Sequence, residues 1–398
     1  ANAGLLTLDD LKSYKTVRSE PVWGKYRGYR VASSQPPSGG VMIIEMLNIL
    51  ENFNLSEIVH NSAEYITIVS EAMKYATIDK DKKMGDPAFE NIPISDFTDK
   101  KHAVSLAERI KAGEKANVVR FGHYQESKDT THVAVVDEHG NVASMTHSLG
   151  MPSGVVTEGL GFMYNGCMGA FDPRPGTPHS IAPGKRRFTA MCPTIVFKGE
   201  DPYIIVGAPG GTFITMGVLQ SILNVIDFNM SMQEAVSAPR FTSNSNTIDV
   251  SNRIPHFVTD ALLHHGYSVV RSPFSYVFAG VHGIRILNGK WDGTQLILDE
   301  KFNWSDGEVQ TRQWKINKID EHNYEGTAGD VVGKAKGYSY GPAFKFEYVL
   351  LVPVKGKQMK ITFDDWIFKQ DDKVAINRAK MTKFGIKVAE LTVLFVKD

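Results

Sequence analysis

The spacing of hydrophobic residues changes twice along this chain of 398 residues, and each change limits the folds that it can adopt. Up to about residue 115, apolar residues such as Val41, Ile44 and Leu47 recur at helical spacing. From Thr130 the spacing becomes two, which is typical of strands that bury one face. Past about residue 295 helical spacing nearly vanishes. The pattern predicts an α+β fold followed by a β-rich segment.

Three helices are predicted in the first part of the chain. A buried helix spans Val41 to Leu50, after a short run that ends in two glycines. A second helix begins near Asn61, because Glu64 follows three residues later and apolar residues at helical spacing come next. A third, more exposed helix runs from Ala103 to Ala112.

Two strand pairs follow the change of period. His132 to Asp137 and Val142 to His147 flank a polar loop with a central glycine, which predicts a hairpin. Thr194 to Lys198 and Tyr203 to Gly207 form the second pair, and an apolar helix through Val218 and beyond comes after it. Strands flanked by helices in this order suit layered sheets covered by helices.

Composition excludes several classes of protein. The formal net charge is zero, which argues against a nucleic-acid partner. No apolar run approaches the roughly 18 residues that a membrane span requires. Cys167 and Cys192 have no metal-ligand or redox spacing, so two buried thiols are predicted. His264 and His265 lack a third ligand, and we expect no metal and no cofactor.

Thr130 has two interpretations when its sequence context is taken alone. A threonine that opens a strand is commonplace and usually structural. A threonine hydroxyl becomes a useful nucleophile only when a base activates it. If the peptide bond before Thr130 is cut, the freed α-amine, with a pKa near 8, can be that base.

Eight motifs, in order, resemble the γ-glutamyltransferase family over roughly residues 1–290. They are Gly4-Leu5-Leu6-Thr7, Tyr26-Arg27-Gly28-Tyr29, Pro36 to Gly40, Gly85-Asp86-Pro87, Thr130-Thr131-His132, Pro193 to Val196, Gly207 to Thr212 and Ala238 to Phe241. The resemblance implies an N-terminal-nucleophile hydrolase with a partial αββα sandwich. Residues 1–129 would be the end of a heavy chain and residues 130–290 a light chain.

The same resemblance implies a reaction and its residues. The chain would cut itself between Asp129 and Thr130, and the Thr130 hydroxyl would attack a γ-glutamyl amide, glutathione being the usual donor. Water or an acceptor amine would resolve the acyl-enzyme, and the two cleaved chains would stay associated. Gly210 and Gly211 match the pair whose backbone N–H groups form the oxyanion hole, although Pro-Gly-Gly alone is equally a plain turn. Ser148 matches a hydroxyl near the nucleophile's amine.

Several positions depart from the pattern of the family. The acidic residue that holds the substrate's α-amine corresponds to Ala170, and Asp172 lies two residues further on. The paired serines correspond to Thr189 and Ala190, and an asparagine near the nucleophile corresponds to Gly150. These changes leave open a sister acylase that acts on another amide, such as a β-lactam side chain.

Two further expectations concern the rest of this part. Lys185-Arg186-Arg187 predicts a solvated basic loop that extends toward the mouth of the site. Much of the family's heavy chain has no counterpart, including the segment whose arginine binds the substrate's α-carboxylate. A catalytically inactive structural or binding protein is therefore a third alternative. The habit of the family suggests a periplasmic or secreted location, and without a signal peptide a cytoplasmic one stays open.

Residues of about 289–398 resemble a different family, the bacterial lipoproteins of the DUF3833 type. The matching runs are Asp306-Gly307-Glu308, Arg312-Gln313-Trp314, Tyr324 to Ala328, Asp330 to Gly333, Phe363 to Trp366, Asn377-Arg378-Ala379 and Lys383-Phe384-Gly385. The resemblance implies an antiparallel, lipocalin-like and incomplete barrel over residues 291–398. A short sequence common to both families at the junction indicates either a gene fusion or an accidental chimera.

The aromatic residues of this last segment alternate with polar ones, which favours a sheet core; a lipocalin-like pocket for an apolar ligand is the alternative. They are Trp314, Phe344, Phe346, Tyr348 and Trp366. Asp364 and Asp365 would point to opposite faces of a strand, so they cannot both enter one site. A turn or an edge position is predicted for them.

Overall fold

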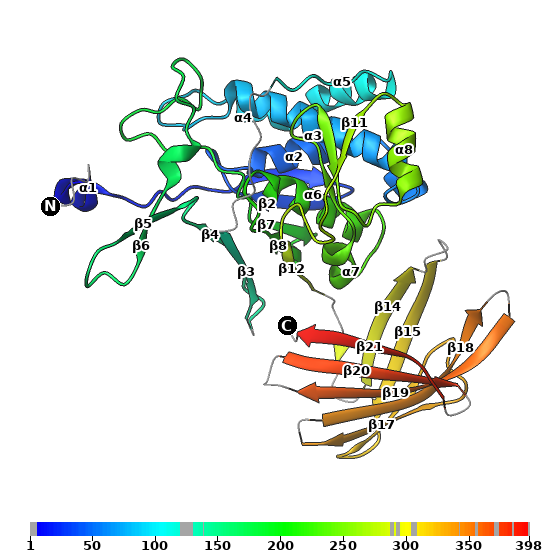
Figure 1. The fold of residues 1–398 in the computed structure, drawn as a ribbon. Helices are drawn as coiled ribbons and strands as arrows, with labels where there is room; N and C mark the ends of the chain where they lie inside the picture. The colour runs from blue at the N-terminus through cyan, green and yellow to red at the C-terminus, as the bar shows by residue number, and fades with distance from the viewer. Residues whose placement is uncertain are drawn as a thin grey trace.

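The structure is a computed structural model, and Figure 1 shows its α+β fold. It describes residues 6–119, 130–137, 139–286, 290–291, 295–303, 309–341, 343–354, 357–369, 374–383 and 386–396. The helices are α1 (Leu8–Ser13), α2 (Gly40–Leu50), α3 (Ala63–Lys83), α4 (Ile94–Thr98), α5 (Lys100–Lys111), α6 (Ile214–Ile226), α7 (Met232–Ser237) and α8 (His256–His264), with short 3-10 turns η1 (Leu55–Glu57), η2 (Cys167–Ala170) and η3 (Gly211–Phe213).

The strands fall into two groups on either side of residue 286. The first group is β1 (Val22–Tyr26), β2 (Tyr29–Ser33), β3 (Thr130–Val136), β4 (Val142–Ser148), β5 (Pro152–Val156), β6 (Met163–Asn165), β7 (Thr194–Lys198), β8 (Asp201–Gly207), β9 (Phe241–Thr242), β10 (Thr247–Val250), β11 (Ser268–Arg271) and β12 (His282–Arg285). The second is β13 (Lys290–Trp291), β14 (Gln295–Asn303), β15 (Val309–Lys318), β16 (Asn323–Thr327), β17 (Ala335–Tyr340), β18 (Ala343–Val354), β19 (Lys357–Lys369), β20 (Val374–Lys383) and β21 (Ile386–Val396).

A five-stranded antiparallel sheet in the order β1-β2-β7-β8-β12 organises the first part. Helix α2 packs on β1 and β2 and contacts α3, α5 and α6, so it lies inside the helical layer. All of its residues are buried, as the apolar run predicted. The approach is close because Gly24 has no side chain: a Cβ there would lie 2.6 Å from Ile44 Cγ2.

The β3–β4 hairpin contacts β8 and β12 and forms a further layer. Ser144 Oγ donates a hydrogen bond of 3.1 Å to the Val206 carbonyl, which ties the hairpin to the sheet. Its other side is open, since Val133 and Met145 are 43% and 58% exposed. The predicted partial αββα sandwich is therefore confirmed as helices, sheet and hairpin, with no helix over that open side among the described residues.

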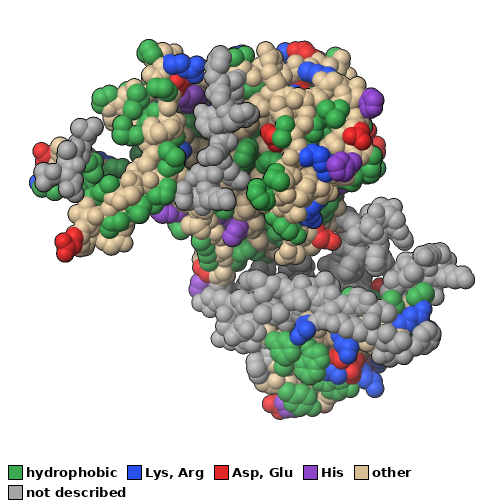
Figure 2. All heavy atoms as spheres, in the orientation of Figure 1, with side chains coloured by type: hydrophobic (Ala, Val, Ile, Leu, Met, Phe, Trp, Pro, Cys, Tyr) green, Lys and Arg blue, Asp and Glu red, His purple; other side chains and the backbone are tan. Residues whose placement is uncertain are grey.

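A second pair, β5 and β6, extends away from the sheet (Figure 1). Figure 2 shows hydrophobic side chains along this arm, where Val155, Val156 and Phe162 are each more than half exposed. Within the described residues, none of the helices is both long and apolar enough to cross a bilayer.

The three predicted helices are confirmed, with one correction at a helix start. Helix α3 is capped by Ser62, whose hydroxyl accepts from the Tyr65 amide, and not by Asn61. Asn61 adopts a positive φ of 57° and donates from Nδ2 to the Pro239 carbonyl at 2.9 Å. A cap needs extended backbone, so its φ excludes Asn61 from that role.

The second group of strands forms a nine-stranded antiparallel sheet in sequence order from β13 to β21. Its core consists of Trp314, Ile316, Ala335, Phe346, Tyr348 and Leu350, which confirms a sheet core. Trp366 is an exception, because it is 38% exposed and stacks on Phe368. No ladder between described residues joins β13 to β21, which agrees with an incomplete barrel.

The prediction of a turn or edge for Asp364 and Asp365 is wrong. Both lie within β19, which pairs with β18 on one side and β20 on the other. Tyr348 Oη donates to Asp365 Oδ2 at 2.7 Å, and Lys345 Nζ lies 3.6 Å from Asp364 Oδ1. These partners let a central strand hold two carboxylates, which strands otherwise disfavour.

Candidate functional site

A cavity of about 720 Å³ collects most of the residues that the sequence singled out. Its lining includes Thr130, Ser148, Asp172, Thr189, Ala190 and Gly211. They come from two strand ends, two loops and the start of η3, so residues up to 81 positions apart in the sequence share one hollow. Asp129, the predicted residue before the cut, lies outside the described residues.

Thr130 and Ser148 face each other at the end of the β3–β4 ladder, where their Cα atoms are direct partners. The Thr130 Oγ1 and Ser148 Oγ atoms are 2.9 Å apart, and either can be the donor. Ser148 Oγ also accepts from the Gly150 amide at 2.9 Å. No described histidine or carboxylate bonds to either hydroxyl, so the arrangement leaves the role of base to another group.

Gly210 and Gly211 form the turn between β8 and α6. Their φ angles are 141° and 58°, which favour glycine, and a Cβ on Gly210 would lie 2.6 Å from Ala279 Cα. Neither amide N–H donates to a carbonyl among the hydrogen bonds of the described residues. Two unsatisfied backbone donors beside a cavity can stabilise a developing oxyanion.

The positions predicted to grip a glutamate contain little that would hold an ammonium group. Ala170 lines the cavity with a methyl group. Asp172 is occupied, because Arg174 donates to both of its oxygens at 2.9 Å and Thr177 Oγ1 adds a third bond. These bonds, led by the Arg174 side chain, hold the pKa of Asp172 well below its usual range.

Comparison with known proteins gives the family of the first part. Residues 1–295 match the family model described as gamma-glutamyltranspeptidase. The chain belongs to the gamma-glutamyltranspeptidase family. Residues 283–397 match a second model, described as a protein of unknown function (DUF3833).

Similar proteins within this family carry two kinds of name. The chain is 40% identical over 276 residues to an Acylase ACY 1 proenzyme of Pseudomonas sp. (strain V22), covering 69% of this chain and 50% of that protein. It is 38% identical over 257 residues to the glutathione hydrolase proenzyme of Escherichia coli (strain K12), covering 60% and 44%. The chain spans about half the length of the curated relatives that it matches.

A solved structure resembles the fold as well. The cephalosporin acylase from Bacillus halodurans superimposes with a TM-score of 0.62 at 26% identity, covering 82% of this chain and 55% of that one. The predicted resemblance to N-terminal-nucleophile hydrolases is thus confirmed by sequence and by fold.

His132, the third residue of the Thr130-Thr131-His132 motif, packs within the fold. His132 does not line the cavity; its ring lies against Gly207, and its Nδ1 is 2.9 Å from Thr146 Oγ1. Burial, with a smaller contribution from His282, lowers the pKa of His132 to about 4. The neutral, packed His132 side chain therefore supports the hairpin, and among the described residues no hydrogen bond joins it to Thr130.

The prediction of two buried thiols is half right. Cys192 is fully buried, and burial raises the pKa of its thiol well above the usual range. Cys167 is only partly buried and lines the cavity, where its thiol donates to the Leu149 carbonyl at 3.4 Å. Both thiols are free.

A second polar cluster lies between α2, α3 and α5, and the sequence gave no sign of it because its members are far apart. His102 Nε2 is 3.0 Å from Asp79 Oδ2 and 3.7 Å from Glu45 Oε1. Burial raises the pKa of Glu45 to about 8. Glu45 contributes most to raising the pKa of His102 to about 9; burial opposes the rise and Asp79 adds to it. The ligand atoms of these three side chains lie within 4.8 Å of one another, a spacing that a divalent cation could bridge. The pairing of His102 with Asp79, beside the buried Glu45, accounts for the cluster without a cation.

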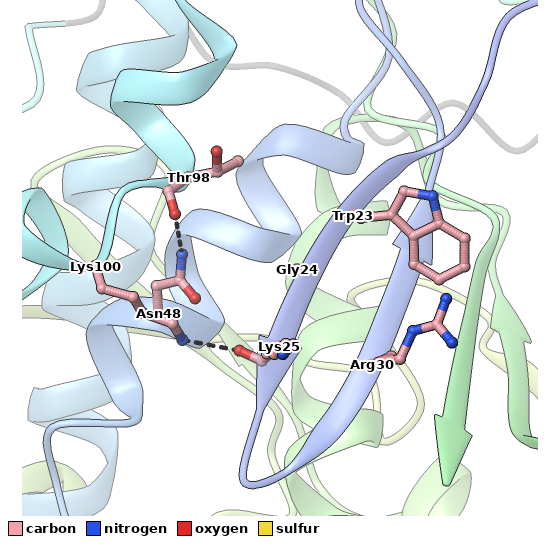
Figure 3. Close-up of a pocket in the computed structure, with 7 residues that line it drawn as sticks. All are labelled: Trp23, Gly24, Lys25, Arg30, Asn48, Thr98 and Lys100. Carbon is pink, nitrogen blue, oxygen red and sulfur yellow. Dashed lines mark hydrogen bonds between the residues drawn. The ribbon is translucent and has the colours of Figure 1, made fainter. Parts of the chain in front are cut away.

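A smaller groove of about 400 Å³ lies at the edge of the sheet beside β1 (Figure 3). The Arg30 guanidinium stacks over Trp23 at 4.6 Å, and Asn48 Nδ2 donates to the Thr98 carbonyl. The groove shares no lining residue with the Thr130 cavity. It presents no paired hydroxyls, and the glycine that lines it, Gly24, lies within strand β1 and not in a turn, so the chemistry is assigned to the cavity.

Proposed function

We propose that the chain cuts itself between Asp129 and Thr130 and then hydrolyses or transfers the acyl group of a small-molecule amide. One observation carries the proposal: the 2.9 Å pair of Thr130 and Ser148 hydroxyls shares a cavity with Gly211, the second of two glycines whose amides have no acceptor among the described residues. The relatives named above are proenzymes, which agrees with a self-cleaving precursor.

The cut begins when the Thr130 hydroxyl adds to the Asp129 carbonyl carbon. The C–N bond then breaks, the hydroxyl proton passes to the departing nitrogen, and an ester joins Asp129 to Thr130 Oγ1. Water hydrolyses this ester and frees the Asp129 carboxylate and the Thr130 hydroxyl, and the amine released when the C–N bond broke becomes the new N-terminus. Ser148 Oγ, at 2.9 Å, orients the attacking hydroxyl.

The freed amine then serves as the base for turnover. With a pKa near 8, it accepts the Thr130 hydroxyl proton as Oγ1 attacks the amide carbonyl of the donor. The amides of Gly210 and Gly211 stabilise the oxyanion, and each such donor contributes about 3 kcal/mol to transition-state stabilisation in comparable sites. The leaving amine takes the proton, and water or an acceptor amine releases the acyl group from Thr130.

The two products of cleavage would stay together because they share one sheet. Strand β2, before the cut, pairs with β7, after it, over the register from Arg30 with Phe197 to Ser33 with Thr194. Helices α2 and α6, one from each side of the cut, are in contact and belong to the same core. Separation would expose this core, so a heavy and light fragment are expected to copurify.

Between the two kinds of donor, the cavity favours a non-glutamyl amide, and thus an acylase. An α-ammonium group would need a free carboxylate, but Ala170 has none and Asp172 is held by Arg174. A site without a partner for an ammonium group discriminates against substrates that carry one. The names of the relatives include both acylase and glutathione hydrolase, so both donors belong in the test.

The test is expression of the full chain followed by intact mass measurement and donor assays. The proposal predicts a fragment that begins at Thr130, abolished in Thr130→Ala and retained in the matched control Thr131→Ala. The cleaved chain should release p-nitroaniline from acyl p-nitroanilides. Two outcomes would contradict the proposal and favour a binding or structural protein: a parent chain that stays whole, or a Thr130→Ala variant that is cleaved as well as the parent.

A further inference from the structure

Strand β1 lies at the edge of the five-stranded sheet, and β2 is the one described strand that pairs with it. In an antiparallel ladder, every second residue turns its N–H and C=O groups away from the paired strand. Lys25 is such a residue, because its carbonyl accepts a hydrogen bond of 2.8 Å from Lys100 Nζ of α5, outside the sheet. Trp23, two residues earlier, therefore turns its backbone groups to the same free side.

Three backbone groups of this edge have no partner among the described residues. They are the Trp23 N–H, the Trp23 C=O and the Lys25 N–H. The groove of about 400 Å³ lies beside them, with Thr98 and Lys100 opposite β1 and Asn48 on the helix behind (Figure 3). Asn48 is 1% exposed, and its Oδ1 likewise has no donor in the described part of the chain. Unused donors and acceptors along an open groove suit the addition of a further strand.

The charges around the groove indicate which kind of strand would be added. Lys100 pairs with Glu51, and Arg30 pairs with Glu200 at 2.5 Å. Lys25, exposed on β1, has no acidic partner among the described residues. The charge left for a ligand at this edge is therefore positive, which suits an acidic segment.

We propose that the free edge of β1 binds an extended acidic segment of another protein by strand addition. An acidic residue of that segment lies opposite Lys25, and an apolar residue two positions away lies against the Trp23 ring, which is 43% exposed. A second copy of this chain fits less well, because it would bring its own Lys25 and Lys100 to the same edge. The edge is independent of the proposed function, since the groove shares no lining residue with the Thr130 cavity.

The first test uses a short blocked peptide in which glutamate alternates with valine. It carries a fluorophore and is titrated at low ionic strength into the full chain, with binding followed by fluorescence anisotropy. The glutamate peptide is expected to bind, and the same peptide with lysine in place of glutamate should bind about 10-fold more weakly. A glutamate peptide methylated on the backbone nitrogens along one edge should also bind about 10-fold more weakly, because strand addition uses those N–H groups.

The methylated peptide separates strand addition from attraction between charges alone, and it needs no change to the protein. If it binds as well as the unmethylated peptide, the added strand is wrong. Equal binding of the lysine peptide, or no binding of the glutamate peptide, would also overturn the proposal.

Amide hydrogen exchange followed by mass spectrometry locates the bound peptide. Residues 22–26 should exchange more slowly with the glutamate peptide bound, because the outward N–H groups of Trp23 and Lys25 then have acceptors. Protection at other segments with none at residues 22–26 would overturn the proposal. A chain that dimerises with protection of residues 22–26 and binds no peptide would assign the edge to a second copy instead.

Reversing the charge of Lys25 gives the last test. Lys25→Glu should weaken binding of the glutamate peptide about 3- to 10-fold and strengthen binding of the lysine peptide, a reversal that a loss of folding could not produce. Lys82→Glu is the matched control, because Lys82 is exposed on α3 and lines neither the groove nor the cavity. An unchanged preference in Lys25→Glu, or an equal change in Lys82→Glu, would show that the edge of β1 does not select the peptide.

Discussion

Replacing Glu45 by glutamine is expected to flatten the pH dependence of the stability of the helical core. Glu45 is fully buried in α2, and burial raises its pKa from about 4.5 to about 8. Since the folded-state pKa is the higher one, the unfolded chain releases the proton first as pH rises. The stabilisation is therefore complete below about pH 4.5 and is lost as the pH rises through about 8.

Each unit of difference between the folded-state and unfolded-state pKa of Glu45 changes the free energy of unfolding by about 1.36 kcal/mol. Between about pH 5 and pH 7.5, the free energy of unfolding of the parent should fall by roughly 3 kcal/mol more than that of Glu45→Gln. His102, with its pKa raised to about 9, acts in the same direction from about pH 6.5 upward. Its side chain is 35% exposed, so solvent screening reduces its share.

Urea unfolding followed by circular dichroism at the helical band is the assay. Every described helix ends by His264, so this signal reports the first part of the chain and not the nine-stranded sheet. Glu108→Gln, at an exposed position of α5, is the control and should reproduce the parent's slope. Parallel profiles for the parent and Glu45→Gln between about pH 5 and pH 6.5, where His102 contributes little, would refute the reasoning.

Two further predictions concern packing and thiol access. Gly207→Ala should lower the free energy of unfolding by about 1–3 kcal/mol, because a Cβ there would lie 2.2 Å from the His132 ring. Adding His132→Ala should restore part of the lost stability. An unchanged urea midpoint for Gly207→Ala would contradict the close packing of His132 on Gly207. Iodoacetamide should modify Cys167 in the native chain and spare Cys192, which is fully buried, until the chain unfolds. Mass spectrometry of the peptides measures both, and modification of Cys192 before Cys167 would contradict their assigned burial.

Local sequence patterns predicted the elements well wherever neighbouring residues decide the structure. The apolar run of α2 and the alternation of β3 and β4 are examples, because each depends on the period of one segment. The start of α3 was misplaced by one residue, since Asn61 and Ser62 are both good caps and a tertiary bond from Asn61 to Pro239 decides between them.

The candidate site was predicted only as far as the resemblance reached. Thr130, Ser148 and Gly211 meet in one cavity, as the family motifs implied. The sequence predicted that the basic loop of Lys185, Arg186 and Arg187 extends toward the mouth of the site, but not that Arg187 is the one that lines the cavity. That depends on Asp86, which holds Arg186 and lies 100 residues away from it. The cluster of Glu45 with His102 was missed for the same reason, since no pattern within one segment links residues of different helices.

The covalent state of Thr130 during turnover tests the central claim most directly. The self-cleaved chain is mixed with an acyl p-nitroanilide that it hydrolyses, quenched in acid, digested and analysed by mass spectrometry. The proposed mechanism predicts one acyl group on the peptide that begins at Thr130, carried by its hydroxyl. An acyl group on Thr131 or Ser148 instead, or turnover that persists in Thr130→Ala, would contradict it.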